Sequence, residues 1–145
     1  MKMYIKNLTP EDYDAVLKLW ELADLSSYRP FGRDSKDHML REMKENPELF
    51  FGAFENGKLV GICIGTDDGR KGWLNRLAVH PDYRRRGIAS RLIALTEEAL
   101  RKRGRKIICT LIEEWNTESL QLFKKMGYEI HRDIFYLSKR ENPEV

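Results

Sequence analysis

The chain has 145 residues, of which 41% are hydrophobic and 34% are charged, which argues against a disordered or fibrous chain and for one globular domain over residues 1–145. Its 26 basic and 23 acidic residues leave a net charge of +3, too small an excess to indicate nucleic-acid binding by itself. No apolar stretch reaches the roughly 18 residues of a membrane span, and early acidic residues argue against a signal peptide, so we expect a cytoplasmic protein. Cys63 and Cys109 lie in apolar runs and predict free thiols, with no metal site.

The first 45 residues predict one strand and two helices. Residues 3–8 alternate in polarity as a strand does, and Thr9-Pro10 followed by two acidic residues is typical of a helix start. The helix that follows has apolar residues at helical spacing: Tyr13, Val16, Leu17 and Trp20. After a loop over residues 25–34, a second helix is expected over residues 35–45 and ends before Pro47.

The middle of the chain predicts an antiparallel hairpin and a third strand. Residues 49–55 and 58–66 are strand-like, and Asn56-Gly57 between them tolerates positive φ at both turn positions. A second turn over residues 67–72 leads to a further strand over residues 73–80.

A helix and a short strand follow. From Gly87 the apolar spacing changes to the period of a helix, which ends at Gly104 and has one apolar face: Ile88, Leu92, Leu95 and Ala99. Residues 107–112 then form a short apolar strand bracketed by charged residues.

The last 30 residues predict a helix and a closing pair of strands. Asn116 is suited to cap a helix that ends at Gly127 and buries Leu120, Phe123 and Met126. Residues 128–131 and 134–138 are predicted as two strands that close the chain. The element order predicts a mixed α/β fold, antiparallel in its front half, with one parallel crossover through the helix from Gly87.

The segment from Val79 to Ala89 carries the clearest chemical signal. A strand ends at Val79, three arginines follow at Arg84–Arg86, and a helix opens at Gly87 with little side-chain bulk. The unpaired amides of a helix start, together with guanidinium groups, suit a phosphate. A solvated basic face is the alternative, but the ordered combination of strand, turn, basic triplet and helix favours a diphosphate cradle.

Here the sequence resembles the GCN5-related N-acetyltransferase (GNAT) family. Arg84-x-x-Gly87-x-Ala89 matches the family's coenzyme signature, and a second motif lies about 30 residues further on: Asn116, Ser119, Phe123, Gly127 and Tyr128. The resemblance covers almost the whole chain. A subgroup of small bacterial and archaeal predicted acetyltransferases is similar in further residues: Leu19-Trp20-Glu21, Pro30 and Asp68-Gly69-x-x-Gly72.

The resemblance implies a mostly antiparallel sheet of six to seven strands with four helices, in which the fourth and fifth strands splay apart. It also implies that acetyl-CoA lies in that opening as the cosubstrate and is attacked directly by an amine. The residues that would contact the coenzyme are Leu77, Ala78, Val79, Arg84, Arg85, Arg86, Gly87, Ile88, Ala89, Asn116 and Phe123.

Acetyl transfer requires a neutral amine, so a group must accept a proton from the ammonium form. Asp68 and Glu114 are the general-base candidates, and the plain alternatives are a turn former and a solvated acid at a strand end. Asn75 faces the same side of its strand as Leu77 and is a candidate to hold a water near the acceptor. Many family members have a tyrosine as general acid where this chain has Phe123, so the general acid stays unassigned.

The resemblance implies that the loop over residues 25–34 and the second predicted helix wall the acceptor pocket. Tyr28, Arg29 and Phe31, with Arg33, would make this wall aromatic and cationic and would favour an amine that has an acidic group nearby. The alternative is that these four are packing residues and surface charges. The acceptor is then a small molecule or a peptide amine, and the protein is a monomer or a homodimer.

Two other readings stay open at this point. A coenzyme-binding domain without catalysis is consistent with the missing tyrosine. A nucleic-acid-binding module would use Arg84–Arg86 and residues 101–106, but the charges nearly balance and no aromatic residue interleaves that second run.

Overall fold

The computed structural model describes residues 2–23 and 33–145. Its sheet has five strands in the described part of the chain, in the order of the sequence: β1 Met3–Asn7, β2 Phe50–Glu55, β3 Lys58–Asp67, β4 Gly72–Val79 and β5 Ile108–Thr110. The first four strands are antiparallel neighbours, and β5 lies parallel to β4. The predicted mixed sheet with one parallel crossover is thus confirmed.

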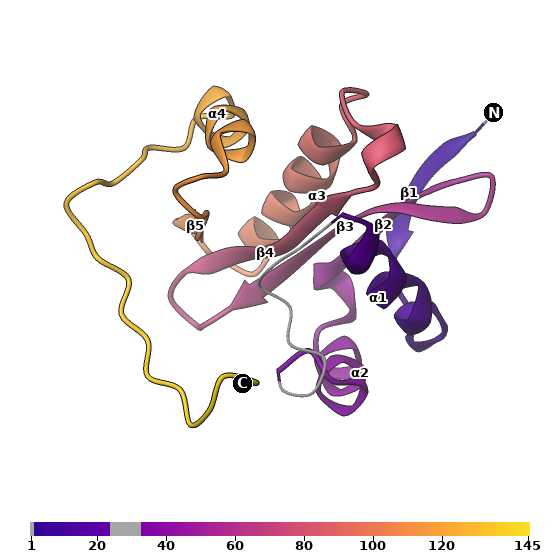
Figure 1. Cartoon of the computed structure of the whole chain (residues 1–145), viewed down its shortest axis with the longest axis horizontal. Helices are drawn as coiled ribbons and strands as arrows, with labels where there is room; N and C mark the ends of the chain where they lie inside the picture. The colour runs from indigo at the N-terminus through magenta and orange to yellow at the C-terminus, as the bar shows by residue number, and fades with distance from the viewer. Residues whose placement is uncertain (1, 24–32) are drawn as a thin grey trace.

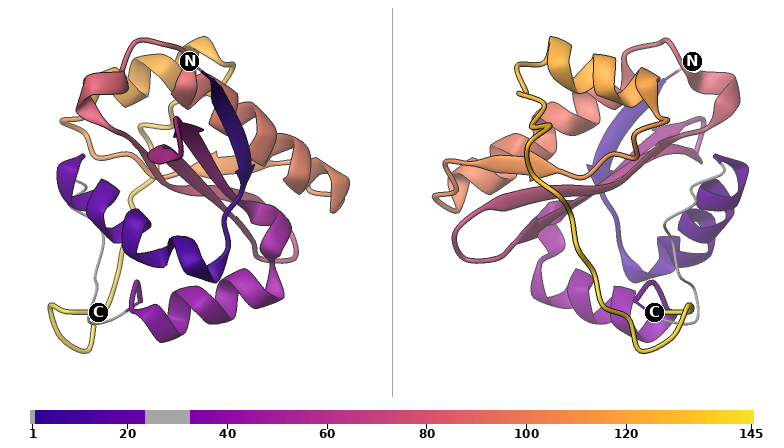
Figure 2. Two further views of the ribbon diagram at one scale, coloured as in Figure 1. Left: turned by 90° about the vertical axis from the view of Figure 1, so that its right-hand side faces the viewer. Right: turned by 60° about the vertical axis from the view of Figure 1, so that its left-hand side comes forward.

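In the described part of the chain, four α-helices cover the two faces of the sheet (Figures 1 and 2). Their bounds are α1 Tyr13–Leu22, α2 Lys36–Glu45, α3 Ile88–Lys102 and α4 Thr117–Lys125. Alternation along β3 divides the core, because Ile62 packs with α1 and α2 while Cys63 packs with α3 and α4. Both cysteines are free thiols, and in the described ranges no helix is long and apolar enough to cross a membrane.

Glycines let α3 approach the sheet closely. A Cβ at Gly65 or Gly72 would lie 2.9 Å from Thr96 or 2.8 Å from Leu100, a separation too short for real carbon atoms. The buried stripe of α3 differs from the predicted one and consists of Ile88, Leu92, Ile93, Thr96 and Leu100. Close packing against the glycines of the strands determines which face of α3 is buried. Helical periodicity alone predicted a face rotated slightly from the one observed.

Local signals in the sequence form the predicted turns and caps. Asn56 and Gly57 both have positive φ, at 52° and 78°, and close the hairpin between β2 and β3. The Ser35 hydroxyl accepts from the amide of His38 at the start of α2. These devices act within four residues, which is why the sequence alone predicts them.

The predicted closing strands over residues 128–131 and 134–138 are wrong. The chain after α4 forms no strand; its extended trace bows out from α4 and returns to end near α2 (Figure 1). Its apolar residues are largely exposed: Ile134, Phe135, Tyr136 and Leu137. This apolar run is continuous rather than alternating, and strand propensity cannot supply the hydrogen-bonding neighbour that a strand needs. The described sheet therefore has five strands, fewer than the six to seven expected.

Candidate active site

The sheet opens between β4 and β5. These strands pair only over residues 72–74 and 108–110, and β4 then continues to Val79 after β5 has ended. No strand in the described part of the chain pairs with this edge of β4 beyond Leu74. The main chain of residues 75–79 therefore borders an open cleft, where an extended ligand can add in the manner of a strand. The splay of the fourth and fifth strands is as expected.

A bulge in β4 lies beside this opening. Cys63 on β3 faces both Arg76 and Leu77, because the register shifts between the flanking pairs, and Arg76 takes a positive φ of 54°. The Arg76 guanidinium donates to both carboxylate oxygens of Asp34, at 3.1 and 3.2 Å. The Tyr13 hydroxyl also donates to the Asp34 carbonyl oxygen at 3.1 Å. This buried network ties the bulge to the segment before α2 and to α1.

The turn between β4 and α3 presents main-chain amides. His80 caps a 3₁₀ turn over Pro81–Tyr83, accepting from a backbone amide at 3.1 Å through Nδ1. Arg85 and Gly87 then take positive φ values of 64° and 77°, and α3 begins at Ile88. A Cβ at Gly87 would meet no heavy atom within 4 Å, so the approach to the helix start is unobstructed. Such a turn and helix N-terminus favour an anion.

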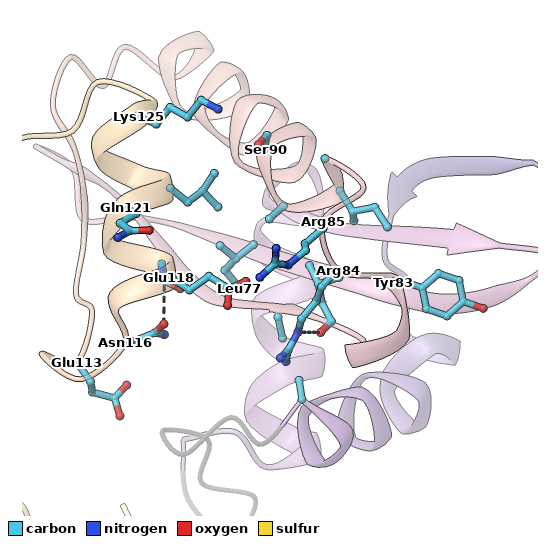
Figure 3. Close-up of a pocket in the computed structure, with 18 of the residues that line it drawn as sticks. Leu77, Tyr83, Arg84, Arg85, Ser90, Glu113, Asn116, Glu118, Gln121 and Lys125 are labelled. Atoms are coloured by element: carbon cyan, nitrogen blue, oxygen red, sulfur yellow. Dashed lines mark hydrogen bonds between the residues drawn. The ribbon is translucent and has the colours of Figure 1, made fainter.

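The three neighbouring arginines point in different directions. The Arg84 Nε atom donates to the Val79 carbonyl oxygen at 3.2 Å, and the side chains of Arg84 and Arg85 line the cleft (Figure 3). Arg86 instead lies 3.6 Å from a Glu55 carboxylate oxygen and places its guanidinium over the Tyr83 ring, 4.9 Å from the ring centroid. Arg86 is not part of the cleft lining, whereas the other two arginines are.

The opposite wall comes from α4. Asn116 caps this helix by accepting from the Ser119 amide at 3.2 Å, and the next turns contribute Glu118, Gln121 and Lys125 (Figure 3). The sequence analysis missed these last three side chains. Their spacing of three and four residues along a polar helix face is the signal for a common wall.

We call this site the α3–α4 cleft; it encloses about 640 Å³. Its lining includes Leu77, Ala78, Val79, Arg84, Arg85, Gly87, Ile88, Ala89 and Asn116, all residues expected at the coenzyme. Ser119, from the second family motif, also lines it, and further lining residues that the sequence did not single out are Ala23, Tyr83, Ser90, Glu113, Trp115 and Leu122. The cleft therefore combines bare main chain on one side with basic and polar side chains around it.

A second cavity of about 890 Å³ lies next to the cleft, and we call it the α2 cavity. Its walls come from α2, β3, β4, the segment after β5 and the C-terminal segment, and they include Met39, Glu42, Ile64, Thr66, Ile112, Tyr136 and Arg140. The two sites share Leu77, Glu113, Asn116 and Ser119 as lining residues. A ligand in one can therefore meet a ligand in the other at these shared residues.

Phe123 lines the α2 cavity rather than the cleft. Its ring packs edge-on against Tyr128, with 4.9 Å between the ring centroids. The Tyr128 hydroxyl donates to the Glu97 carboxylate, and burial followed by this acidic partner raises the pKa of Tyr128. Tyr128 thus holds its proton in a structural contact.

The two predicted base candidates lie outside both sites. Asp68 is in the turn between β3 and β4, where one carboxylate oxygen accepts from two backbone amides at 2.8 and 2.7 Å and the other accepts from Trp73 Nε1 at 3.0 Å. These bonds, led by that from the Lys71 amide, lower the pKa of Asp68 to about 2. Glu114 is exposed in the segment before α4. Its neighbour Glu113 does line both sites.

The predicted acceptor residues are described only in part. Asn75 lines the α2 cavity, where its amide nitrogen donates to the Thr66 hydroxyl at 2.7 Å. Arg33 lines the same cavity. Tyr28, Arg29 and Phe31 lie outside the described residues.

Comparison with known proteins places this geometry in a family. The sequence model of the acetyltransferase (GNAT) family matches residues 16–128. A Pectobacterium atrosepticum protein named an acetyltransferase is 38% identical over 138 residues, which is 95% of each chain. A Sodalis glossinidius protein with the same kind of name is 36% identical over the same length and coverage.

Solved structures share the fold. An N-acetyltransferase (PaiA) from Thermoplasma acidophilum, solved with coenzyme A, superposes with a TM-score of 0.79 at 21% identity, over 90% of this chain and 92% of that one. The aminoglycoside acetyltransferase AAC(6')-Iy, solved with a bisubstrate analogue, gives a TM-score of 0.77 at 19% identity, over 97% and 99% of the two chains.

Proposed function

This chain belongs to the acetyltransferase (GNAT) family, and from that premise we propose that it transfers the acetyl group of acetyl-CoA to a primary amine of a small molecule or peptide. The amine attacks the thioester directly while both substrates are bound. The observation that carries this proposal is the α3–α4 cleft, where an unpaired strand edge leads to the open start of a helix beside two arginines.

Each part of the coenzyme has a matching part of the cleft. The diphosphate is bound by the first amides of α3, at residues 87–89, and by the guanidinium groups of Arg84 and Arg85. The pantetheine arm lies along the edge of β4 at residues 77–79, where main-chain groups replace a neighbouring strand. The thioester then reaches the residues that the cleft shares with the α2 cavity, and the acceptor occupies that cavity.

Backbone groups of β4 stabilise the charge that develops during the reaction. Negative charge develops on the thioester oxygen during attack, and a backbone N–H near Leu77 and Ala78 is suited to bind it. Phe123 has no ionisable proton, so protonation of the departing thiolate falls to solvent or to another group. A side chain with a pKa of about 2, such as Asp68, is a weak proton acceptor at neutral pH.

The function is tested by two measurements on the same protein. Acetyl-CoA should raise the melting temperature, and an acceptor panel of amino acids, spermidine, aminoglycosides and peptides should reveal at least one amine that releases free thiol. The expected cationic acceptor wall predicts that amines with a nearby acidic group are acetylated faster than spermidine. Faster turnover of spermidine would contradict that preference. A thermal shift without thiol release from any amine would instead favour the coenzyme-binding domain without catalysis, which Phe123 keeps open.

A further inference from the structure

One charged side chain of the α2 cavity, that of Glu42, is not paired with any residue in the described part of the chain. Glu42 lies on α2, is half-buried and lines the cavity. Its carboxylate makes no hydrogen bond or ion pair with any residue that the structure describes. An unpaired carboxylate that is partly removed from water costs free energy, so its place in a cavity calls for a ligand that it can bind.

The charges around Glu42 indicate which ligand this is. Arg76 on β4 is bound by both carboxylate oxygens of Asp34, so its charge is already largely neutralised. From α2 itself, Glu42 is near His38 and Glu45. The cavity's other charged lining residues are Arg33, Glu113 and Arg140. None of these described cations is ion-paired with Glu42, and an ammonium group bound beside it would supply that pairing charge.

The same surroundings strengthen Glu42 as a proton acceptor. Burial is the main cause that raises the pKa of Glu42, and the Asp34 carboxylate adds to it, while Arg76 and His38 act in the opposite direction. A carboxylate with a raised pKa takes a proton from an ammonium group more readily than an ordinary one.

We propose that Glu42 is a catalytic residue that binds the acceptor's ammonium group and accepts its proton. This inference rests on the proposed function. One proton passes from the ammonium nitrogen to Glu42 and then to water. The neutral nitrogen attacks the acetyl carbon, the C–S bond breaks, and the second proton leaves the nitrogen as the amide forms and ends on the coenzyme thiol. The acceptor is thus an aliphatic amine that arrives charged.

The test compares Glu42→Gln with Glu45→Gln, an exposed glutamate on the same helix. The assay uses whichever of lysine, spermidine, an aminoglycoside or an alanyl peptide the unmodified protein acetylates fastest. Glu42→Gln should lower kcat/KM for that amine by roughly 100-fold at pH 7, within the range for loss of a general base. The KM for acetyl-CoA and the rate of Glu45→Gln should stay within about twofold of the unmodified protein.

Two further readouts separate catalysis from support of the fold. The deficit of Glu42→Gln should shrink as the pH approaches about 10, where an alkylamine is already largely neutral. Its melting temperature should be equal or higher, because the amide removes an unpaired charge. Unchanged kcat/KM, a deficit independent of pH, or a lower melting temperature that accounts for the loss would overturn the proposal. If the unmodified protein acetylates no amine but still binds acetyl-CoA, the proposed function itself has failed.

Discussion

The α3–α4 cleft and the α2 cavity share four lining residues but are built from different parts of the chain. In the cleft, the edge of β4 and the start of α3 offer main-chain groups whose chemistry is independent of side-chain identity. In the α2 cavity, an ion pair between Asp34 and Arg76 and the carboxylate of Glu42 set the character of the walls. Main-chain groups are sufficient to bind a coenzyme that does not vary. Selection of the acceptor depends instead on a few side chains that are held in place by contacts between distant parts of the sequence.

The largest expected effect follows from breaking the ion pair of the α2 cavity. Arg76→Ala leaves the Asp34 carboxylate, whose side chain is only 6% exposed, without its cation. The loss of one partner of a buried pair costs about 3–5 kcal/mol, and we expect a decrease of that size in the free energy of unfolding. Urea unfolding measures it, and Arg132→Ala, at an exposed arginine, is the control.

A second variant shows whether the pair itself is responsible. Asp34→Ala together with Arg76→Ala removes both charges, so the double variant should be more stable than Arg76→Ala alone. If the contrast between the two sites holds, acetyl-CoA should still bind to Arg76→Ala once it is folded, while KM for the acceptor rises. A double variant that is no more stable than the single one would show that packing, rather than the charge, holds the bulge.

The complementary change alters the cleft and leaves the α2 cavity intact. Gly87→Glu places a side chain and a negative charge at the open start of α3. Like charge against the diphosphate should weaken acetyl-CoA binding by roughly 100-fold, or about 2.7 kcal/mol. Isothermal titration calorimetry measures this affinity directly.

The control for this variant has nearly the same backbone strain. Gly57 has a φ of 78°, against 77° at Gly87, and a Cβ at Gly57 would also meet no heavy atom within 4 Å. Gly57 lies in the hairpin turn between β2 and β3, outside the α3–α4 cleft. Gly57→Glu is therefore the matched variant. Both variants should lose a similar, small amount of stability, and only Gly87→Glu should lose the coenzyme. Normal acetyl-CoA binding by Gly87→Glu would show that the coenzyme does not bind at the start of α3.

The same contrast explains what the sequence predicted. The signals for the cleft are local: the hairpin at Asn56-Gly57, the cap at Asn116 and the small residues from Gly87 all act within a few positions. The three arginines show the limit of such signals. They are identical in type, yet Arg86 turns to Glu55, a residue distant in the sequence, and leaves the cleft.

The α2 cavity was harder to predict because its defining contacts join distant parts of the chain. Asp34 and Arg76 are 42 residues apart, and nothing in their local sequence pairs them. Glu42 looks like any polar residue of an amphipathic helix until α2 is placed against the cavity. The prediction of the closing strands was wrong for the same reason, because a strand needs a hydrogen-bonding neighbour and the sequence of residues 134–138 does not specify one.

The smallest expected effect lies outside both sites, at Asp68. Its folded pKa of about 2, against an ordinary value of 3.8, means that the ionised form is favoured by the folded turn. The resulting stability is present above about pH 4 and is lost as the pH falls toward 2. Asp68→Ala should therefore melt at a lower temperature than the unmodified protein at pH 7, and the difference should disappear near pH 2.

The activity of this variant decides between two roles for Asp68. A turn former whose carboxylate is occupied by two amides and the Trp73 indole leaves acetyl transfer almost unchanged when it is removed. A general base would instead lower kcat by roughly 100-fold or more. Measuring kcat for Asp68→Ala beside Glu114→Ala, the other early candidate, tests both predictions at a temperature where each variant is folded. A large loss in either would place proton transfer on that side of the molecule and would remove the need for Glu42.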